Sequence, residues 1–318
     1  MPLVSVVAPM RDEAGTVERF HERVAAALGG ETWELVVVDD GSRDGTGEVL
    51  ARVVAADERV RVIALSRSFG HQAALTAGLE HARGDAVVML DGDLQDPPEL
   101  IATMLARWRE GSEVVYAVRS RRAGESPFKL VTARWFYRLF RRLTEVDLAP
   151  DSGDFRLMDR RALNALLALP ERNRFLRGMS VWVGFTQTAV TFAREARSAG
   201  RTKYTFSRML RFSFDAITSF SNRPLQLATF LGFACSLLAF LAIPLTVVAR
   251  YANIYERGVP STIVVVLLLG GIQLITVGII GEYVGRIYDE VKHRPLYVVR
   301  ERVNVEAPDE RPEAADRS

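Results

Sequence analysis

Residues 86–99 read AVVMLDGDLQDPPE. The first five letters are a short apolar run without polar alternation, which is typical of a strand buried on both faces of a sheet. Two aspartates, Asp91 and Asp93, follow at once and are separated by a single glycine. Because ligands of open α/β sheets bind outside the carboxyl ends of the strands, this junction is the first place to look for a site.

Similar runs alternate with helical segments along the first part of the chain. We predict strands over Leu3 to Ala8, Leu35 to Val38, Val60 to Leu65, Ala86 to Leu90 and Glu113 to Ala117. Helices are predicted over Thr16 to Leu28, Thr46 to Ala55, Gln72 to Ala82 and Pro98 to Arg109. This alternation predicts an α/β fold with a mostly parallel sheet covered by helices. No GxGxxG follows the first strand, which disfavours a dinucleotide-binding fold.

Asp91 and Asp93 leave an extended backbone in the same direction, since one residue separates them. Two carboxylates that converge in this way suit Mg²⁺ or Mn²⁺ shared with a diphosphate, and Gln95 continues the spacing and can add a third oxygen. The alternative is a surface turn whose Asp and Gly residues favour the turn geometry. A second acidic run, DDGSRDGT over residues 39–46, has its own alternative, in which Asp44 or Thr46 caps the next helix.

Two uncharged apolar stretches follow the α/β part, Leu225 to Ala249 and Val259 to Gly281. They hold 25 and 23 residues, more than the roughly 18 to 20 that a helix needs to cross a membrane. We therefore predict a cytoplasmic domain over residues 1–203, a juxtamembrane amphipathic helix over 204–224, a two-helix transmembrane region over 225–284, and a cytoplasmic tail over 285–318 with a disordered end.

Basic residues flank the pair of apolar stretches on its outer sides. They are Arg201, Lys203, Arg208, Arg211 and Arg223 before the first stretch, and Arg286, Lys292, Arg294, Arg300 and Arg302 after the second. The connector over residues 250–258 has only Arg250 and Arg257 against Glu256. By the positive-inside rule, we expect both termini and the α/β domain to face the cytoplasm of a plasma (inner) membrane.

Two further segments are candidates for contact with lipid. Apolar residues recur at helical spacing from Tyr204 to Ser221, which predicts a helix lying in the membrane interface; an ordinary core helix is the alternative. Arg134, Arg138 and Arg141 share one helical face. They either contact anionic headgroups or the acceptor phosphate, or form a solvated charged face.

Five motifs together resemble the family-2 glycosyltransferases. They are residues 9–13, the DDGSRDGT run, SRSFGHQ over 66–72, DGDLQDPPE over 91–99 and SGDFR over 152–156. With two spans added, the chain is similar to the polyprenyl-phosphate glycosyltransferases, a group that includes dolichyl-phosphate mannose synthases and bacterial undecaprenyl-phosphate glucosyltransferases. The resemblance covers roughly residues 3–300 and implies a GT-A type fold, that of nucleotide-diphospho-sugar transferases.

The resemblance also implies roles for individual residues. Asp39 and Asp40 would meet the base and ribose of the donor, with Pro9, Glu13 and Ser42 lining the same pocket. Asp91, Asp93 and Gln95 would hold the divalent cation, with Asp91 also beside the donor. Arg119, Arg156, Arg197 and Lys203 would contact the reacting phosphates. Asp154 would orient the reactants or act electrostatically, because a phosphate nucleophile is already anionic.

This sequence departs from the family pattern at three positions in these motifs. Asp12 and Ser68 stand where asparagine is usual, and Gly92 stands where alanine is usual. All three changes conserve size. Asp12 adds a negative charge near a pocket for a negative ligand.

The predicted reaction is inverting transfer of a sugar from a nucleotide donor, UDP-glucose first, to polyprenyl phosphate at the cytoplasmic leaflet. GDP-mannose is the alternative donor, and a non-catalytic lipid-binding scaffold is the alternative of another class. Two spans cannot enclose a pore within one chain, so we expect a separate flippase downstream. Gly278, Gly281 and Gly285 recur at helix-packing spacing, which favours a homo-oligomer. No nucleic-acid partner is expected.

Overall fold

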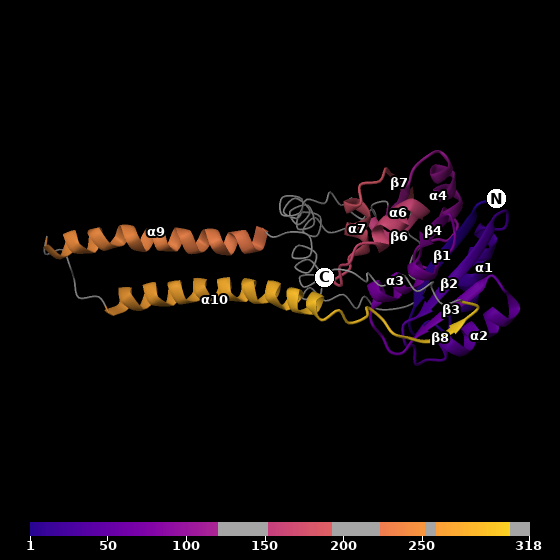
Figure 1. Ribbon diagram of the computed structural model, residues 1–318, viewed down its shortest axis with the longest axis horizontal. Helices are drawn as coiled ribbons and strands as arrows, with labels where there is room; N and C mark the ends of the chain where they lie inside the picture. The colour runs from indigo at the N-terminus through magenta and orange to yellow at the C-terminus, as the bar shows by residue number, and fades with distance from the viewer. Residues whose placement is uncertain (120–151, 193–222, 252–258, 306–318) are drawn as a thin grey trace, which may run out of the picture. The chain divides into compact units, whose positions relative to one another are not determined.

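The computed structural model describes residues 1–119, 152–192, 223–251 and 259–305 (Figure 1). The described chain divides into two units. One is an α/β domain that includes the residues from Pro295 onward, and the other contains two long helices.

The α/β domain is built on one sheet, and its described strands number eight, in the order β7-β5-β6-β4-β1-β2-β3-β8. The strands are β1 (Leu3–Met10), β2 (Thr32–Asp39), β3 (Val60–Leu65), β4 (Ala86–Met89), β5 (Val114–Arg119), β6 (Ser152–Asp159), β7 (Gln187–Phe192) and β8 (Val299–Val303). The central strands β4, β1, β2 and β3 are parallel, whereas β6 and β8 pair antiparallel with β4 and β3. The predicted mostly parallel sheet is confirmed.

Helices cover both faces of this sheet (Figure 1). They are α1 (Val17–Ala27), α2 (Thr46–Ala56), α3 (His71–His81), α4 (Leu100–Arg109), α6 (Arg160–Leu167) and α7 (Leu176–Trp182). Helix α1 packs with both α2 and α4, and α6 packs with both α3 and α7, so the helices form two groups. All four helices predicted from the sequence are present, with ends within two residues of the predicted ones.

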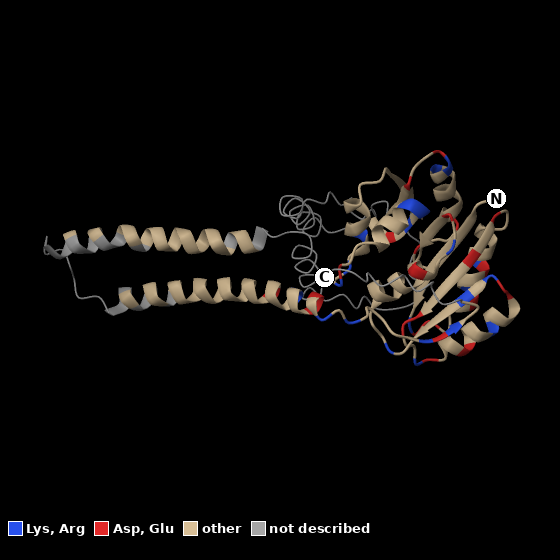
Figure 2. Cartoon of the chain, in the orientation of Figure 1, with Lys and Arg blue, Asp and Glu red and all other residues tan. Residues whose placement is uncertain are grey.

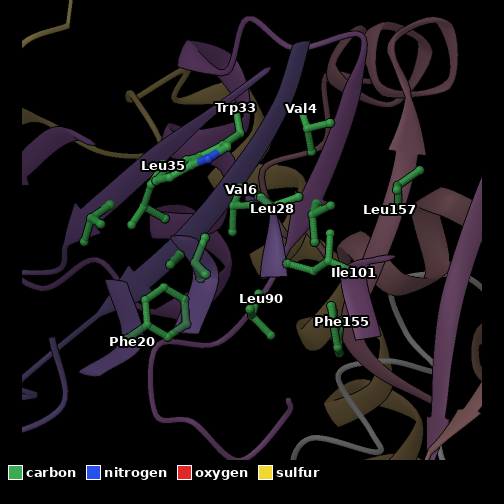
Figure 3. Packing of buried hydrophobic residues seen from close by; sticks show 14 of the residues in the cluster. Val4, Val6, Phe20, Leu28, Trp33, Leu35, Leu90, Ile101, Phe155 and Leu157 are labelled. Carbon is green, nitrogen blue, oxygen red and sulfur yellow. The ribbon is translucent and has the colours of Figure 1, made fainter. Parts of the chain in front are cut away.

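The main core lies between the sheet and the α1, α2 and α4 group. Val4 and Val6 alternate along β1 toward this side and meet Phe20 of α1 and Ile101 of α4 (Figure 3). On the other face α3 approaches closely, because a Cβ at Gly78 would lie 2.3 Å from Val7 Cγ1. Glycine is therefore required for α3 to sit on β1.

Strand β8 adds residues from the predicted tail to the sheet. It pairs with β3, and Arg61 near the start of β3 is buried. The Arg61 guanidinium donates to Glu34 Oε2 at 2.8 Å and to the carbonyl of Asn304 at 3.0 Å. Arg61 thus forms a buried ion pair within the sheet and links the sheet by a hydrogen bond to Asn304, near the end of the described chain.

The second unit consists of α9 (Arg223–Tyr251) and α10 (Val259–Val291), which contact each other. Large apolar side chains such as Phe233, Phe240 and Leu274 are exposed on them, and charged residues gather near the C-terminal end of α10 (Figure 2). Among the side chains that the structure describes, one stretch, Leu268–Val291, is long and apolar enough to cross a membrane by length and composition. In α9 the described apolar run is the shorter Ala228–Leu238.

Candidate active site

The candidate site lies where the strand order reverses. Strand β1 has β2 on one side and β4 on the other, and ligands of open α/β sheets bind beyond the carboxyl ends of the strands at such a point. Antiparallel β6 begins at the same edge, with Arg156 paired to Met89, the last residue of β4. Continuing that register by two residues brings Asp91 opposite Asp154.

Hydrogen bonds join the loops after β1 and β2. The backbone N–H of Asp12 donates to Ser42 Oγ at 3.0 Å, and that of Arg43 donates to Asp12 Oδ1 at 2.8 Å. Asp12 adopts a φ of 55°, which aspartate tolerates better than most residues. The carboxylate that replaces the usual asparagine therefore serves as an acceptor between the two loops.

Asp39 and Asp40 are both buried at the end of β2 and bond to the loops around them. Asp39 Oδ1 accepts from the backbone N–H of Ser42 at 2.9 Å. Asp40 accepts from Ser68 Oγ and from the N–H of Phe69, both at 2.7 Å. Asp40 thus holds the loop after β3 in place, and a contact of either carboxylate with a nucleotide stays a prediction.

The loop after β4 carries the acidic pair. Asp93 accepts from the backbone N–H of Gln95 at 3.0 Å and from its side-chain amide at 2.5 Å. Burial raises the pKa of Asp91 to about 6, and the charges of Asp154 and Asp93 act in the same direction against the opposing effect of His71. Asp91 is therefore an acid crowded by other acids.

The side chain of Met10 packs closely against Gly92. A Cβ at this position would lie 2.7 Å from Met10 Cγ and 2.8 Å from Met10 Cε. The side chain of Met10, which is buried at the end of β1, fills the space that the usual alanine methyl would need. The glycine and the methionine are therefore a matched pair beneath the acidic loop.

The donor set fits a hard divalent cation. Asp91, Asp93 and the amide oxygen of Gln95 offer only oxygen ligands, and a cation would offset the repulsion that raises the pKa of Asp91. In the described part of the chain, no three His, Cys, Asp or Glu side chains form a metal-binding group. The set therefore suits a cation that takes its remaining ligands from a diphosphate and water.

Asp154 receives donors from two helices. His71 Nε2 lies 3.3 Å from Asp154 Oδ2 and 3.5 Å from Asp91 Oδ1, so it bridges the two carboxylates. Gln72 donates to Asp154 Oδ2 at 3.2 Å, and Arg177 lies 3.3 Å from Asp154 Oδ1. Burial alone would raise the pKa of Asp154, but the hydrogen bond from His71 and the charge of Arg177 hold it well below its usual range. Asp154 is therefore an ionised carboxylate and a weak base.

The pKa of His71 is raised, whereas that of Asp154 is lowered. Burial lowers the pKa of this imidazole, yet the hydrogen bond to Asp154 and the charge of Asp91 outweigh burial and raise the pKa above its ordinary value. Protonation of an imidazole between two carboxylates would reduce their mutual repulsion.

Arg156 has a buried position, with 2 % of its surface exposed. Its Nη1 donates to the carbonyl of Arg177 at 3.3 Å and to Ser180 Oγ, and its Nη2 donates to the carbonyl of Gly153 at 3.1 Å. Its buried Nε has no hydrogen-bond partner among the described residues. The guanidinium joins the start of β6 to α7, and its proposed contact with phosphate stays a prediction.

Known proteins identify the class of enzyme. A family model described as glycosyl transferase family 2 matches residues 5–167. The chain belongs to this family. The uncharacterized glycosyltransferase YkcC of Bacillus subtilis is 46 % identical over 305 residues, covering 95 % of this chain and 94 % of that protein. Bactoprenol glucosyl transferase of Shigella phage SfV is 38 % identical over 301 residues, covering 93 % of this chain and 98 % of that protein.

Among solved structures, the chain is similar to glucosyl-3-phosphoglycerate synthase from Mycobacterium tuberculosis in complex with Mn²⁺, UDP-glucose and phosphoglyceric acid. The TM-score is 0.48 with 21 % identity, covering 68 % of this chain and 77 % of that chain.

Some of the remaining predicted site residues of this family-2 glycosyltransferase lie at or just after the ends of strands, and the others lie outside the described residues. Pro9 is buried near the end of β1, and Arg119 is the last residue of β5. Burial raises the pKa of Glu13, and the charge of Asp93 adds to the rise against a hydrogen bond from Thr16. The interfacial helix predicted over 204–224 lies mostly outside the described residues, as do Arg134, Arg138, Arg197 and Lys203.

Two site residues were not predicted from the sequence. Arg177 and Gln72 both contact Asp154, and Gln72 also accepts from the backbone N–H of Leu176 at 3.0 Å. The SRSFGHQ motif contains both Gln72 and its neighbour His71. No local signal distinguishes Arg177 from the other arginines near it.

Proposed function

We propose that this glycosyltransferase transfers a sugar from a nucleoside-diphosphate donor, UDP-glucose first, to polyprenyl phosphate at the cytoplasmic leaflet. One observation carries the proposal. The same chain contains an acidic site at the carboxyl ends of the central strands and two helices that expose large apolar side chains. Relatives named bactoprenol glucosyl transferase, which match over 93 % of the chain, support the lipid acceptor and glucose.

In the proposed reaction, an oxygen of the lipid phosphate attacks the anomeric carbon as the bond from that carbon to the nucleoside diphosphate breaks. The electron pair of the broken bond leaves with the nucleotide. One direct displacement inverts the anomeric centre, so an α-linked donor gives a β-linked lipid phosphosugar. An α-linked product on NMR would exclude this mechanism.

The low pKa of Asp154 supports an orienting or electrostatic role for its carboxylate. A phosphate nucleophile is already ionised at neutral pH and needs little help from a base. His71, Gln72 and Arg177 hold Asp154 as an anion, which would stabilise positive charge that develops at an anomeric carbon bound beside it.

We propose Mg²⁺ or Mn²⁺ as the cofactor, held by Asp91, Asp93 and Gln95. Such a cation stabilises negative charge on the departing diphosphate. The oxygen-only donor set supports the proposal, and the choice between the two metals is a matter for metal titration.

Pairing of β8 with β3 supports two membrane crossings. Residues 1–119 and 299–303 belong to one sheet, which lies on a single side of any membrane. The chain between them, which includes α9 and α10, therefore crosses an even number of times. A single crossing by Leu268–Val291 alone is incompatible with the sheet, so we propose that α9 is the second span. The distribution of basic residues supports a cytoplasmic domain.

The remaining parts of the proposal are supported by the amino-acid sequence alone. Residues 204–224 are proposed to lie in the membrane interface, and Arg197 and Lys203 to contact the reacting phosphates. Arg134 and Arg138 are proposed to contact lipid headgroups or the acceptor phosphate; charge reversal at both that leaves the KM for lipid acceptor unchanged would favour a solvated face. Homo-oligomerisation and a separate flippase complete the proposal.

A donor panel tests the function. Membranes containing the protein are incubated with polyprenyl phosphate and labelled UDP-glucose or GDP-mannose, each with Mg²⁺, Mn²⁺ or EDTA. We expect a glycolipid from UDP-glucose that requires the metal. Product from GDP-mannose alone would instead identify a mannose synthase. Absence of product from a full range of sugar nucleotides would favour a lipid-binding scaffold.

A further inference from the structure

The proposed substrates are strongly anionic, yet the described centre of the site is acidic. Asp91, Asp93 and Asp154 converge there, and Glu13 lies close enough to Asp93 for the two charges to interact. A diphosphate and a phosphate monoester therefore need protein cations in addition to a metal. Arg156 has the right charge, but both of its Nη atoms are bonded to the protein and its side chain is buried.

Arg177 is the accessible arginine of the same cluster. Its side chain is 24 % exposed, and its guanidinium lies beside the Phe175 ring, 5.7 Å from the centroid. Both of its contacts with Asp154, at 3.3 and 3.4 Å, go to the single oxygen Oδ1. These distances exceed the roughly 2.7 to 2.9 Å of a strong arginine–carboxylate pair. The guanidinium is therefore near Asp154 without forming the bidentate pair that would fix it.

Asp154 does not depend on Arg177 alone. His71 and Gln72 both contact Oδ2, the other carboxylate oxygen. If the Arg177 side chain turned away, Asp154 would still have two partners. This division of donors lowers the cost of releasing Arg177.

The backbone at Arg177 is fixed even though its side chain is loosely held. The Arg177 carbonyl accepts from Arg156 Nη1 at 3.3 Å and from Ser180 Oγ at 2.9 Å. The preceding N–H, that of Leu176, donates to Gln72 Oε1 at 3.0 Å. The side chain therefore moves from a rigid base, which reduces the entropy lost when it binds a ligand.

We propose that Arg177 binds a phosphate oxygen of the substrate, exchanging its loose contact with Asp154 for a charge-assisted contact with the phosphate. Arg156 supports this function by anchoring the Arg177 backbone. The inference rests on the proposed transfer, because that reaction supplies the anionic ligand. The phosphate belongs either to the nucleotide donor or to the lipid acceptor, and binding measurements separate the two.

The test compares Arg177→Met and Arg177→Lys in the full-length, detergent-solubilised protein. Methionine keeps the apolar part of the side chain and removes the charge, whereas lysine keeps the charge and loses the planar fork. Arg161→Met is the matched control, because Arg161 is exposed on α6 and pairs with Glu113 and Asp159. Melting temperatures within about 3 °C of the wild type establish that each variant is folded.

Binding of UDP and of uridine is measured by calorimetry in Mn²⁺, and KM and kcat are measured for polyprenyl phosphate. If Arg177 binds the donor, Arg177→Met weakens UDP by about 10- to 100-fold and leaves uridine unchanged. If it binds the acceptor, the KM for polyprenyl phosphate rises by a similar factor while UDP affinity is unchanged. Arg177→Lys recovers part of the loss in either case, and Arg161→Met matches the wild type.

Two results would overturn the inference. One is wild-type behaviour of Arg177→Met in all these measurements. The other is a lower kcat with unchanged UDP affinity and unchanged KM for lipid, which would mean that Arg177 only positions Asp154. Failure of the proposed function is distinct, because it would appear as absence of glycolipid with the wild-type protein while the UDP measurement remains interpretable.

Discussion

Replacing Asp91 by asparagine is expected to stabilise the metal-free protein at neutral pH. The substitution keeps the size of the side chain and removes a charge that burial and neighbouring acids oppose. The pKa of Asp91 in the folded protein, about 6, is higher than its ordinary value of 3.8. The folded protein therefore holds the proton more tightly than the unfolded chain does. The resulting stabilisation is complete below about pH 4 and is lost as the pH rises through 6.

The size of the effect follows from the shift in the pKa. A difference of roughly two units, at about 1.4 kcal/mol each, corresponds to about 3 kcal/mol without screening. The Asp91 side chain is 37 % exposed, so water screens its charge and about half of that value is a better expectation. For a domain of this size, about 1.5 kcal/mol raises Tm by roughly 3 to 6 °C.

The assay is thermal unfolding of the solubilised protein in EDTA at pH 7.5 and pH 4.5. Asp91→Asn should melt higher than the wild type at pH 7.5, and the gain should fall by more than half at pH 4.5. Asp57→Asn is the matched control of opposite sign, because hydrogen bonds from Arg59 and His21 lower the pKa of Asp57 despite its burial. That variant should melt lower at pH 7.5. Added Mn²⁺ should stabilise the wild type more than Asp91→Asn. An Asp91→Asn protein no more stable than wild type at pH 7.5 would refute the reasoning.

Three other predictions test the packing around the site. Gly92→Ala should destabilise the protein by about 1 to 3 kcal/mol, because the added methyl group crowds Met10. Adding Met10→Ala to this variant should restore part of the lost stability. Equal stability of Gly92→Ala and wild type in urea unfolding would contradict this. Arg61→Met leaves the Glu34 carboxylate buried without its cation and should cost about 3 to 5 kcal/mol, whereas a cost below about 1 kcal/mol would mean that Glu34 finds another partner. Removal of residues 295–318 exposes the edge of β3 and should cause self-association, so a monodisperse peak with an unchanged Tm on size-exclusion and melting analysis would argue against that role for β8.

The parallel centre of the sheet could be predicted because its strands are buried on both faces. Val60–Leu65 was predicted with the bounds that the structure has, and the strand predicted from Leu35 to Val38 extends to Thr32–Asp39. Continuous apolar runs of this length have few alternative structures once helices separate them. The local pattern was therefore sufficient there.

The antiparallel strand β8 was harder to predict from the sequence. Val299–Val303 has the sequence VRERV and joins the sheet through pairing with β3, more than 230 residues earlier in the chain. Three of its five residues are charged, which is common on an edge strand and also common in a tail. Only the partner strand distinguishes the two, and a partner so distant leaves no local pattern.

At the site, the sequence indicated which residue types take part, but it did not indicate how buried each side chain is. Acids that follow buried strands point to a ligand, and Asp91 and Asp93 were predicted as site residues on that basis. Burial is a tertiary property that the sequence does not reveal. Arg156, whose contact with phosphate stays a prediction, is surrounded by carbonyls and a serine hydroxyl. Arg177, which no motif marks, is partly exposed beside Asp154.

The direction of one strand explains why the acidic site exists in this form. Parallel β1 and β4 alone would supply carboxylates only from loops that follow strands. Because β6 is antiparallel to β4, its first residues meet the end of β4, and the pairing of Met89 with Arg156 brings Asp154 opposite Asp91. A register slip of one residue would turn Asp154 to the other face of the sheet, away from His71. The buried hydrogen bonds of Arg156 oppose such a slip, since they fix the start of β6 against α7. Arg156 can thus support the site through the register of β6, in addition to any contact with phosphate.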